Sequence, residues 1–185
     1  MNTPSHFLMT AFARAFTLRK HPHKVLSRRS IFLGAVAPDL PLYFLSVGTY
    51  VYYVHIMGWP ARSAFRYMFD TLYFENMVWI GLHNTLHAPL VGVTGLWISH
   101  LRSWRALYTF FLACALHSVV DILTHHNDGP VLFFPLDWQY RFASPVSYWD
   151  PAHYGQYFSV FESLLNLFFV GYLLWPLWQQ WKPSR

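Results

Sequence analysis

The stretch that decides the fold is MVWIGLHNTLHAPLVGVTGLWI, residues Met77–Ile98, which contains no Asp, Glu, Lys or Arg. The charge-free region runs without interruption between Glu75 and Arg102. A helix needs about 20 mainly apolar residues to cross a hydrocarbon core of about 30 Å. This stretch therefore predicts a membrane-spanning helix.

Three further stretches have the same character, at residues 31–53, 104–123 and 157–178. The whole chain of 185 residues is 55% hydrophobic and only 11% charged, whereas an ordinary soluble domain carries about 25% charged residues. We therefore predict an all-α, polytopic membrane helical bundle, a single domain over residues 1–185 with about four transmembrane helices. A soluble helical bundle is the alternative, but four long apolar runs cannot all be interior in so small a protein.

The charged residues and the single cysteine exclude several classes of protein. Cys114 is the only cysteine, which excludes an intramolecular disulfide framework and a cysteine-rich zinc module. The chain has 13 basic and 8 acidic residues, but the basic ones cluster beside the apolar runs. That placement favours a membrane surface and not a nucleic acid as the partner.

The basic residues also predict an orientation. They form one group before the first span, one between the second and third, and one after the fourth: Arg19, Lys20, Lys24, Arg28 and Arg29; Arg102 and Arg105; Lys182 and Arg185. All three groups lie on one side if four spans alternate, and the positive-inside rule makes that side cytoplasmic. Residues 50–76 and 124–156 are then on the outer side.

Two short segments outside the spans have an amphipathic helical pattern. His6–Thr17 is expected to be an interfacial or half-buried N-terminal helix, and Ala61–Phe74 a second surface helix. The polar stripe of the second helix consists of Arg62, Arg66 and Asp70, for which we expect a solvated face without chemistry.

The segment Thr124–Gln156 differs from the rest, because its four prolines and two glycines interrupt any helical period. Such long loops are uncommon in compact chains and are usually functional or disordered. Its density of aromatic residues argues against disorder. We therefore expect a folded, aromatic-rich cap.

Ionisable residues inside the apolar runs indicate a site. Each costs about 2.5–3.5 kcal/mol at mid-span, so it is a functional candidate by default. His83 and His87 are four residues apart, as are His117 and Asp121, so each pair lies on one helix face. Asp39 follows Pro38, which can bend the first span. A divalent cation that gathers these groups is the hypothesis that satisfies most of them at once.

Three further ionisable residues lie near the outer ends of the third and fourth predicted spans. His125 and His126 follow Asp121 by one helical turn, and Glu162 lies in the first turns of the last span. The two histidines are further candidate metal ligands. The competing interpretation is structural, because a lone histidine in an apolar helix is more often a hydrogen-bonded core residue than a ligand.

The order of these motifs resembles a known family. The motifs are His6, the segment Gly34–Asp39 (GAVAPD), His83 with His87, His117-x-x-x-Asp121, and Phe133-Phe134-Pro135. This order is similar to that of a family of bacterial inner-membrane metal-dependent hydrolases of unknown function, distantly related to zinc-dependent phospholipase C and S1/P1 nucleases. Two features depart from the family pattern: Pro41 replaces a common second acidic residue, and the paired histidines are four and not five residues apart.

The resemblance implies a multi-pass protein of the bacterial inner membrane with a divalent metal, zinc above others, and His6 among its ligands. It implies that a metal-activated water hydrolyses a phosphodiester or a lipid-like ester reached from the membrane lipids. Asp121 or Glu162 would then act as catalytic carboxylates that orient the water or a ligating histidine, and Arg141 would hold a phosphate.

Two other classes of function stay open at this point. A di-iron membrane oxidase or hydroxylase is suggested by His83 with His87 and by His125 with His126. A non-enzymatic carrier or scaffold would instead use Asp39 and the histidines as a proton relay. A zinc protease and a serine hydrolase are disfavoured, because the sequence contains neither His-Glu-x-x-His nor Gly-x-Ser-x-Gly.

Overall fold

The computed structural model describes residues 1–22 and 26–180. Lys24, Lys182 and Arg185, which the argument on orientation used, lie outside these residues. Within the described part, regular structure is helical except for an isolated antiparallel bridge between Val131 and Arg141. The predicted all-α class is confirmed.

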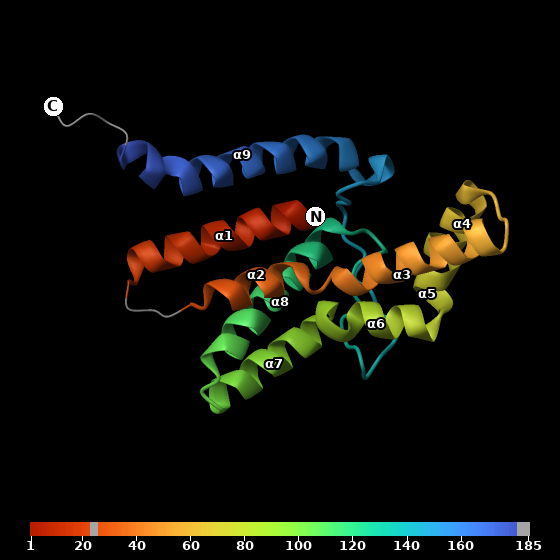
Figure 1. Cartoon of the computed structure of the whole chain (residues 1–185), viewed down its shortest axis with the longest axis horizontal. Helices are drawn as coiled ribbons and strands as arrows, with labels where there is room; N and C mark the ends of the chain where they lie inside the picture. The colour runs from red at the N-terminus through yellow and green to blue at the C-terminus, as the bar shows by residue number, and fades with distance from the viewer. Residues whose placement is uncertain (23–25, 181–185) are drawn as a thin grey trace.

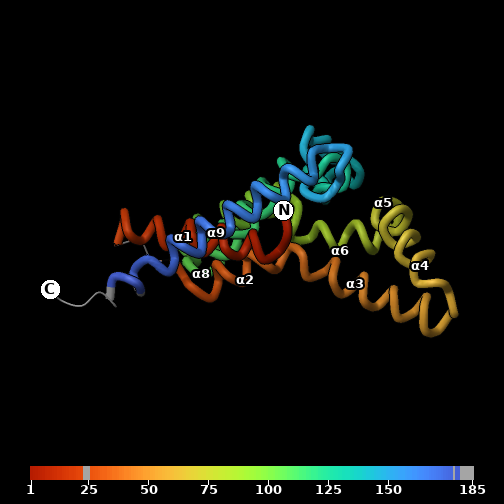
Figure 2. The backbone as a smooth tube through the Cα atoms, turned by 90° about the horizontal axis from the view of Figure 1, so that it is seen from above, coloured from red at the N-terminus to blue at the C-terminus, as the bar shows by residue number. Residues whose placement is uncertain are grey.

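The helices form a layered body and a projecting arm (Figure 1). In the body, α9 packs on α1, α1 on α2, α2 on α8, and α8 on α7. In the arm, α3 packs on α6, and the chain turns back through α4 and α5 (Figure 2). The elements are α1 (Thr3–Lys20), α2 (Arg28–Val36), α3 (Leu40–Tyr50), the π-helix η1 (Val51–Ile56), α4 (Ala61–Tyr67), the π-helix η2 (Met68–Leu72), α5 (Tyr73–Glu75), α6 (Met77–His87), α7 (Pro89–Leu101), α8 (Arg105–Thr124), the 3₁₀-helix η3 (Pro151–His153) and α9 (Gly155–Gln180).

Two of these helices are long and apolar enough to cross a membrane, namely α8 and residues Gly155–Pro176 of α9. A third candidate is the pair formed by α2 and Leu40–Ile56, whose axes meet at 45°. The described residues thus contain two or three candidate spans, which is consistent with a membrane protein. They do not confirm the predicted four.

The predicted span at residues 77–98 is not one helix. The chain leaves the helical conformation at Ala88, where ψ is 130°, and α7 starts at Pro89. Proline has no N–H to donate and disfavours a helical conformation in the residue before it. As a consequence α6 and α7 have only 11 and 13 residues, and His87 lies at the carboxyl end of α6.

The first predicted span is bent where the sequence suggested. α2 ends at Val36 and α3 begins at Leu40, so that Pro38 and Asp39 occupy the break. α2 also approaches α8 very closely, since a Cβ atom on Gly34 would lie 2.3 Å from the carbonyl oxygen of Phe110. Glycine at this position therefore lets the break come close to the middle of α8.

The N-terminal helix extends beyond the predicted 6–17 and turns its polar side inward. His6 and Thr10 are buried, whereas Phe7 is 38% exposed. The same inversion occurs elsewhere, since no residue of α3 is buried and Phe44 is 75% exposed. Large apolar side chains on the outside and polar ones within are what a lipid environment favours.

The predicted cap is an ordered irregular segment. Within this segment, the backbone N–H of Val131 donates a hydrogen bond of 2.8 Å to Oδ1 of the buried Asn84. The backbone N–H of Tyr148 donates to the carbonyl of Thr124 at 2.8 Å. These contacts fix the segment over the carboxyl ends of α6 and α8.

Candidate metal centre

Four acidic and imidazole side chains meet where the break between α2 and α3 faces α8. They are Asp39, His87, His117 and Asp121, and one potential ligand atom from each lies within 4.8 Å of those of the others. His87, His117 and Asp121 are buried, and the side chain of Asp39 is 15% exposed. The described residues therefore contain a buried group that could hold a metal ion.

Each member is placed by a local feature of the chain. His117 and Asp121 project from the same side of α8 because they are one helical turn apart. His87 is the last residue of α6, directly before the break at Ala88. Asp39 precedes the first residue of α3, and its side chain does not cap that helix. Its carboxylate is thus free to face α8.

The Asp121 carboxylate lies at the centre of the group. Its Oδ1 atom is 2.8 Å from His6 Nε2, and its Oδ2 atom is 2.8 Å from His87 Nε2. The amino group of Met1 also lies 2.8 Å from Oδ1 and donates to Thr124 Oγ1 at 2.7 Å. Several donors thus converge on one buried carboxylate, whose charge requires such compensation.

His117 is oriented by the backbone of α2. Its Nδ1 atom lies 2.8 Å from the carbonyl oxygen of Ala35, and a carbonyl can only accept, so Nδ1 carries a proton. In the neutral ring Nε2 then presents a lone pair. This buried atom makes no hydrogen bond, although carboxylate oxygens of Asp121 and Asp39 lie 3.2 and 3.3 Å away. With a neutral ring, three lone-pair donors would face one another, an arrangement that a cation between them stabilises.

Other buried imidazole nitrogens have no hydrogen-bond partner among the described residues: the Nδ1 atoms of His6, His83 and His87. An unsatisfied buried polar group costs about 1–3 kcal/mol, and native proteins contain few of them. Burial lowers the pKa of His6 to about 4, so this ring is neutral near pH 7. Neutral imidazoles and ionised carboxylates are the donors that divalent metals take.

The Asp39 side is the most exposed part of the group. The Thr3 hydroxyl donates to Asp39 Oδ2, and the Thr3 and Tyr43 hydroxyls are 2.9 Å apart. Tyr43 is 54% exposed. Sequence analysis identified neither Thr3 nor Tyr43, because an isolated hydroxyl carries no spacing signal.

His6 lies against the four residues without being one of them. Its ring stacks on that of His117, with centroids 3.7 Å apart and an interplanar angle of 11°. Its Nε2 donates to Asp121. It is therefore placed to orient both residues of the α8 pair.

His83 lies one turn before His87 but contacts a different partner. Its Nε2 is 3.2 Å from the hydroxyl of Tyr73, which itself donates to the carbonyl of Asp128 at 2.6 Å. Burial raises the pKa of Tyr73 to about 12 and lowers that of His83 well below its usual value. Both groups are neutral near pH 7. The structure thus places His87, and not His83, with Asp39, His117 and Asp121.

His125 and His126 are not members of the group of four. The Nδ1 atom of His125 bonds to the backbone carbonyl of Asp121 at 2.9 Å, and it lies 3.6 Å from Oδ1. His126 bonds through Nδ1 to the carbonyl of Ser144, and its ring stacks 3.5 Å from that of His153. Both imidazoles belong to the attachment of the cap.

Glu162 and Arg141 are bound to other groups. Glu162 is buried and accepts a hydrogen bond of 2.9 Å from the backbone N–H of Asn2, which ties α9 to the start of α1. Arg141 donates to the carbonyl of Gly129 and lies 4.8 Å from the ring centroid of Tyr73. Neither side chain lies among the four residues of the candidate centre.

Comparisons with protein-family models, with curated proteins and with solved structures gave no match to this chain. The resemblance described from the motifs is therefore still an expectation.

Proposed function

We propose that this chain is a membrane-bound metal-dependent hydrolase, with zinc held by Asp39, His87, His117 and Asp121. The observation that carries the proposal is the buried Nε2 atom of His117, which faces two carboxylates and has no hydrogen bond. Two imidazoles and two carboxylates form a nitrogen and oxygen donor set that suits zinc.

A bound zinc ion would supply a water of lowered pKa and would polarise the bond to be cleaved. The protein's own residues hold the donors in place. The carbonyl of Ala35 fixes which nitrogen of His117 faces the centre. The ring of His6 packs against His117 and bonds to Asp121. Partners of this kind, behind the ligands, orient the ligands and raise their basicity.

The substrate that we propose is a lipid-like ester or a phosphodiester that reaches the centre past Asp39. The partly exposed Asp39 and the hydroxyls of Thr3 and Tyr43 form the only edge of the described group that is not buried. Apolar side chains cover α3 beside this edge. Since Arg141 is occupied by Gly129 and Tyr73, our proposal gives it no contact with substrate. The cellular location that we propose is the bacterial inner membrane.

A proton relay is the second candidate, because the contacts form an unbroken series. Asp39 is next to His117, His117 is next to Asp121, and Asp121 bonds to His87 and His6. An imidazolium at His117 would neutralise the two carboxylates without a metal ion. The two functions differ in whether the purified protein contains metal.

Elemental analysis of the protein purified in detergent tests the proposal. We expect near-stoichiometric zinc in the wild type and its loss in His117→Ala and Asp121→Ala, with retention in the matched variant His126→Ala. The zinc-loaded protein should hydrolyse a chromogenic phosphodiester or ester, and removal and return of zinc should abolish and restore the activity. Iron in place of zinc would favour an oxidase, and protein without any metal would favour the relay.

A further inference from the structure

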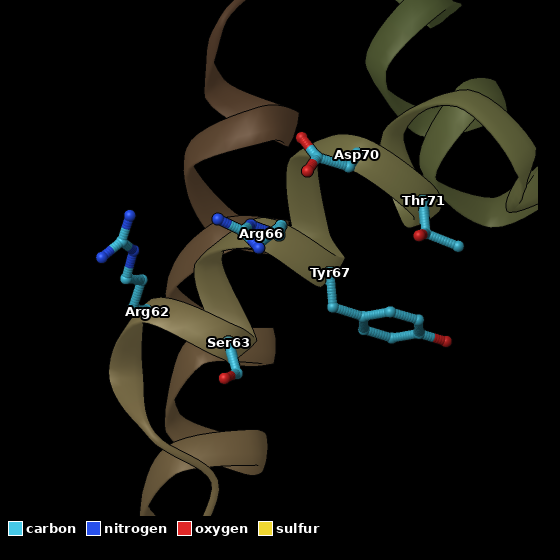
Figure 3. A pocket seen from close by; sticks show the side chains of 6 residues that line it. All are labelled: Arg62, Ser63, Arg66, Tyr67, Asp70 and Thr71. Atoms are coloured by element: carbon cyan, nitrogen blue, oxygen red, sulfur yellow. The ribbon is translucent and has the colours of Figure 1, made fainter.

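The far end of the arm contains an open depression with a volume of about 670 Å³, away from the metal centre. It is lined by the charged and hydroxyl side chains of α4 and η2: Arg62, Ser63, Arg66, Tyr67, Asp70 and Thr71. Figure 3 shows Arg62, Arg66 and Asp70 on successive turns of this helical segment. The sequence suggested only a solvated stripe here, whereas the structure places these charges around a hollow.

The charges of the depression are not paired with one another. Among the described residues, neither arginine is within ion-pair distance of an acidic group, and Asp70 has no basic partner. All three side chains are exposed. Arg66 and Asp70 are spaced as partners in a helix often are, yet they do not form a salt bridge. Two guanidinium groups and one carboxylate are therefore available to a ligand.

The position of the depression relative to the membrane follows from the candidate span that precedes it. That span ends at Ile56, and Trp59 follows it after a turn at Gly58 with φ of 71°. Tyr53, Trp59 and Tyr67 form an aromatic cluster whose centroids are 4.4, 5.3 and 5.6 Å apart. Tyrosine and tryptophan gather at the level of lipid headgroups. If the candidate span crosses the membrane, Arg62 and Arg66 come next to this aromatic cluster, near the level expected for the lipid phosphates.

The backbone of this segment is also unusual. The π-helix η2 covers Met68–Leu72 and therefore carries Asp70 and Thr71 into the wall of the depression. Turns of π-helix are rare and occur frequently at functional sites. This second observation is independent of the charges.

We propose that the depression binds the headgroup of a zwitterionic phospholipid that has a phosphate and a primary ammonium group, as in phosphatidylethanolamine. Arg62 and Arg66 would donate to the phosphate, since guanidinium groups match its oxygens in a bidentate manner. The carboxylate of Asp70 would accept from the ammonium group. The hydroxyls of Ser63 and Thr71 supply further donors within the same hollow.

The acidic residue distinguishes this headgroup from others. A headgroup with phosphate and uncharged glycerol would leave Asp70 without a partner and close to a negative charge. A choline headgroup carries a quaternary ammonium that cannot donate a hydrogen bond to the carboxylate. The primary ammonium satisfies both signs of charge, and the depression would thereby anchor the arm to the membrane surface.

Titration calorimetry with short-chain lipids tests the proposal on the full-length protein in detergent. We expect dihexanoyl phosphatidylethanolamine to bind more tightly than dihexanoyl phosphatidylglycerol, dihexanoyl phosphatidylcholine or inorganic phosphate. Arg62→Ala/Arg66→Ala should weaken binding of the ethanolamine lipid by about tenfold or more, since both charged donors to the phosphate are removed. Asp70→Asn should weaken this lipid by about fivefold and leave the glycerol lipid unchanged or tighter.

The matched control is Arg102→Ala/Arg105→Ala, which removes the same charge from another exposed turn and should not alter the affinity. Unchanged metal content and unfolding temperature in the Arg62 and Arg66 variant would show that the fold and the metal centre are intact. Equal loss of affinity in the control variant, or an Asp70→Asn protein with an unchanged preference for ethanolamine, would overturn the proposal. Inorganic phosphate binding as tightly as the lipid would also overturn it, by showing a site for free anions.

Discussion

The Nε2 atom of His117 lies 3.3 Å from the Oδ1 atom of Asp39, although the two residues belong to different helices far apart in the sequence. The same imidazole donates from Nδ1 to the carbonyl of Ala35, only one helical turn before Asp39. One side chain of α8 thus bonds to the end of α2 and lies against the start of α3. The break is thereby held at the candidate metal centre.

Replacement of Asp39 by asparagine should weaken metal retention by about tenfold or more, because it removes one anionic ligand at nearly constant size. The variant Asp70→Asn is the control, since it removes the same charge from the far end of the arm. Both proteins can be dialysed against a graded series of chelator concentrations and then analysed for zinc. Equal retention in the two variants would remove Asp39 from the centre.

Replacement of Gly34 by alanine should force α2 away from α8, because the new Cβ atom would lie 2.3 Å from the carbonyl oxygen of Phe110. We expect a loss of about 1–3 kcal/mol in the free energy of unfolding and reduced metal content. Gly171→Ala is the matched control, because a Cβ atom there has no neighbour within 4 Å, and alanine stabilises a helix relative to glycine. Denaturant unfolding in detergent, followed by circular dichroism, measures both. A Gly34→Ala protein as stable as the wild type would show that the close approach is not required.

His6→Ala should lower metal affinity, because the ring both stacks on His117 and bonds to Asp121. Residues that support ligands in this way typically change metal affinity by about 10–100-fold. His126→Ala should leave it unchanged, since that ring contacts Ser144 and His153. Competition with a fluorescent zinc chelator gives both affinities. Similar affinities in these two variants would contradict the role given to His6.

A bound metal ion should raise the unfolding temperature, because it would join residues from three parts of the chain and would bind only the folded state. Protons compete with the ion for the same imidazole and carboxylate atoms, so the ion's contribution to stability declines as the pH falls. Thermal unfolding at several pH values, with and without chelator, measures the difference. If the difference in unfolding temperature between the samples with and without chelator grew as the pH was lowered, this expectation would be contradicted.

A fusion of alkaline phosphatase after Trp149 should be active in bacteria if four spans alternate, because the positive-inside rule then puts residues 124–156 outside the cytoplasm. A cytoplasmic reporter at the same position serves as the reciprocal control. Activity of the cytoplasmic reporter alone would contradict this orientation, and would agree with an even number of spans between the N-terminal basic residues and this segment.

The sequence predicted the composition of the candidate centre better than the number of spans. The spacing of His117 and Asp121 on one helix, and the placement of Asp39 after Pro38, were sufficient to predict their convergence. The choice between His83 and His87 was left open, because both lie on the same face of α6. Tyr73 separates the two histidines, because its hydroxyl contacts Nε2 of His83 and donates to the carbonyl of Asp128. No sequence spacing connects Tyr73 to His83.

The second span shows the opposite case. Hydropathy averaged over residues 77–98 hides the local effect of Pro89, which ends α6 at His87. A proline within a helical pattern is a recognised stop signal, so the break was predictable from this residue. The carbonyl of Ala35 was not, because every residue has a carbonyl and only the packing of α2 on α8 makes this one a hydrogen-bond partner of His117.

The contact between His6 and Asp121 joins residues that are synthesised at very different times. α1 leaves the ribosome long before α8 does, and α8 supplies two of the four residues of the centre. During synthesis, the polar side chains of the early helices therefore lack their partners until α8 has been made. Metal incorporation would be a late event in biogenesis, and truncated chains that end before α8 should be recognised as incomplete by membrane quality control.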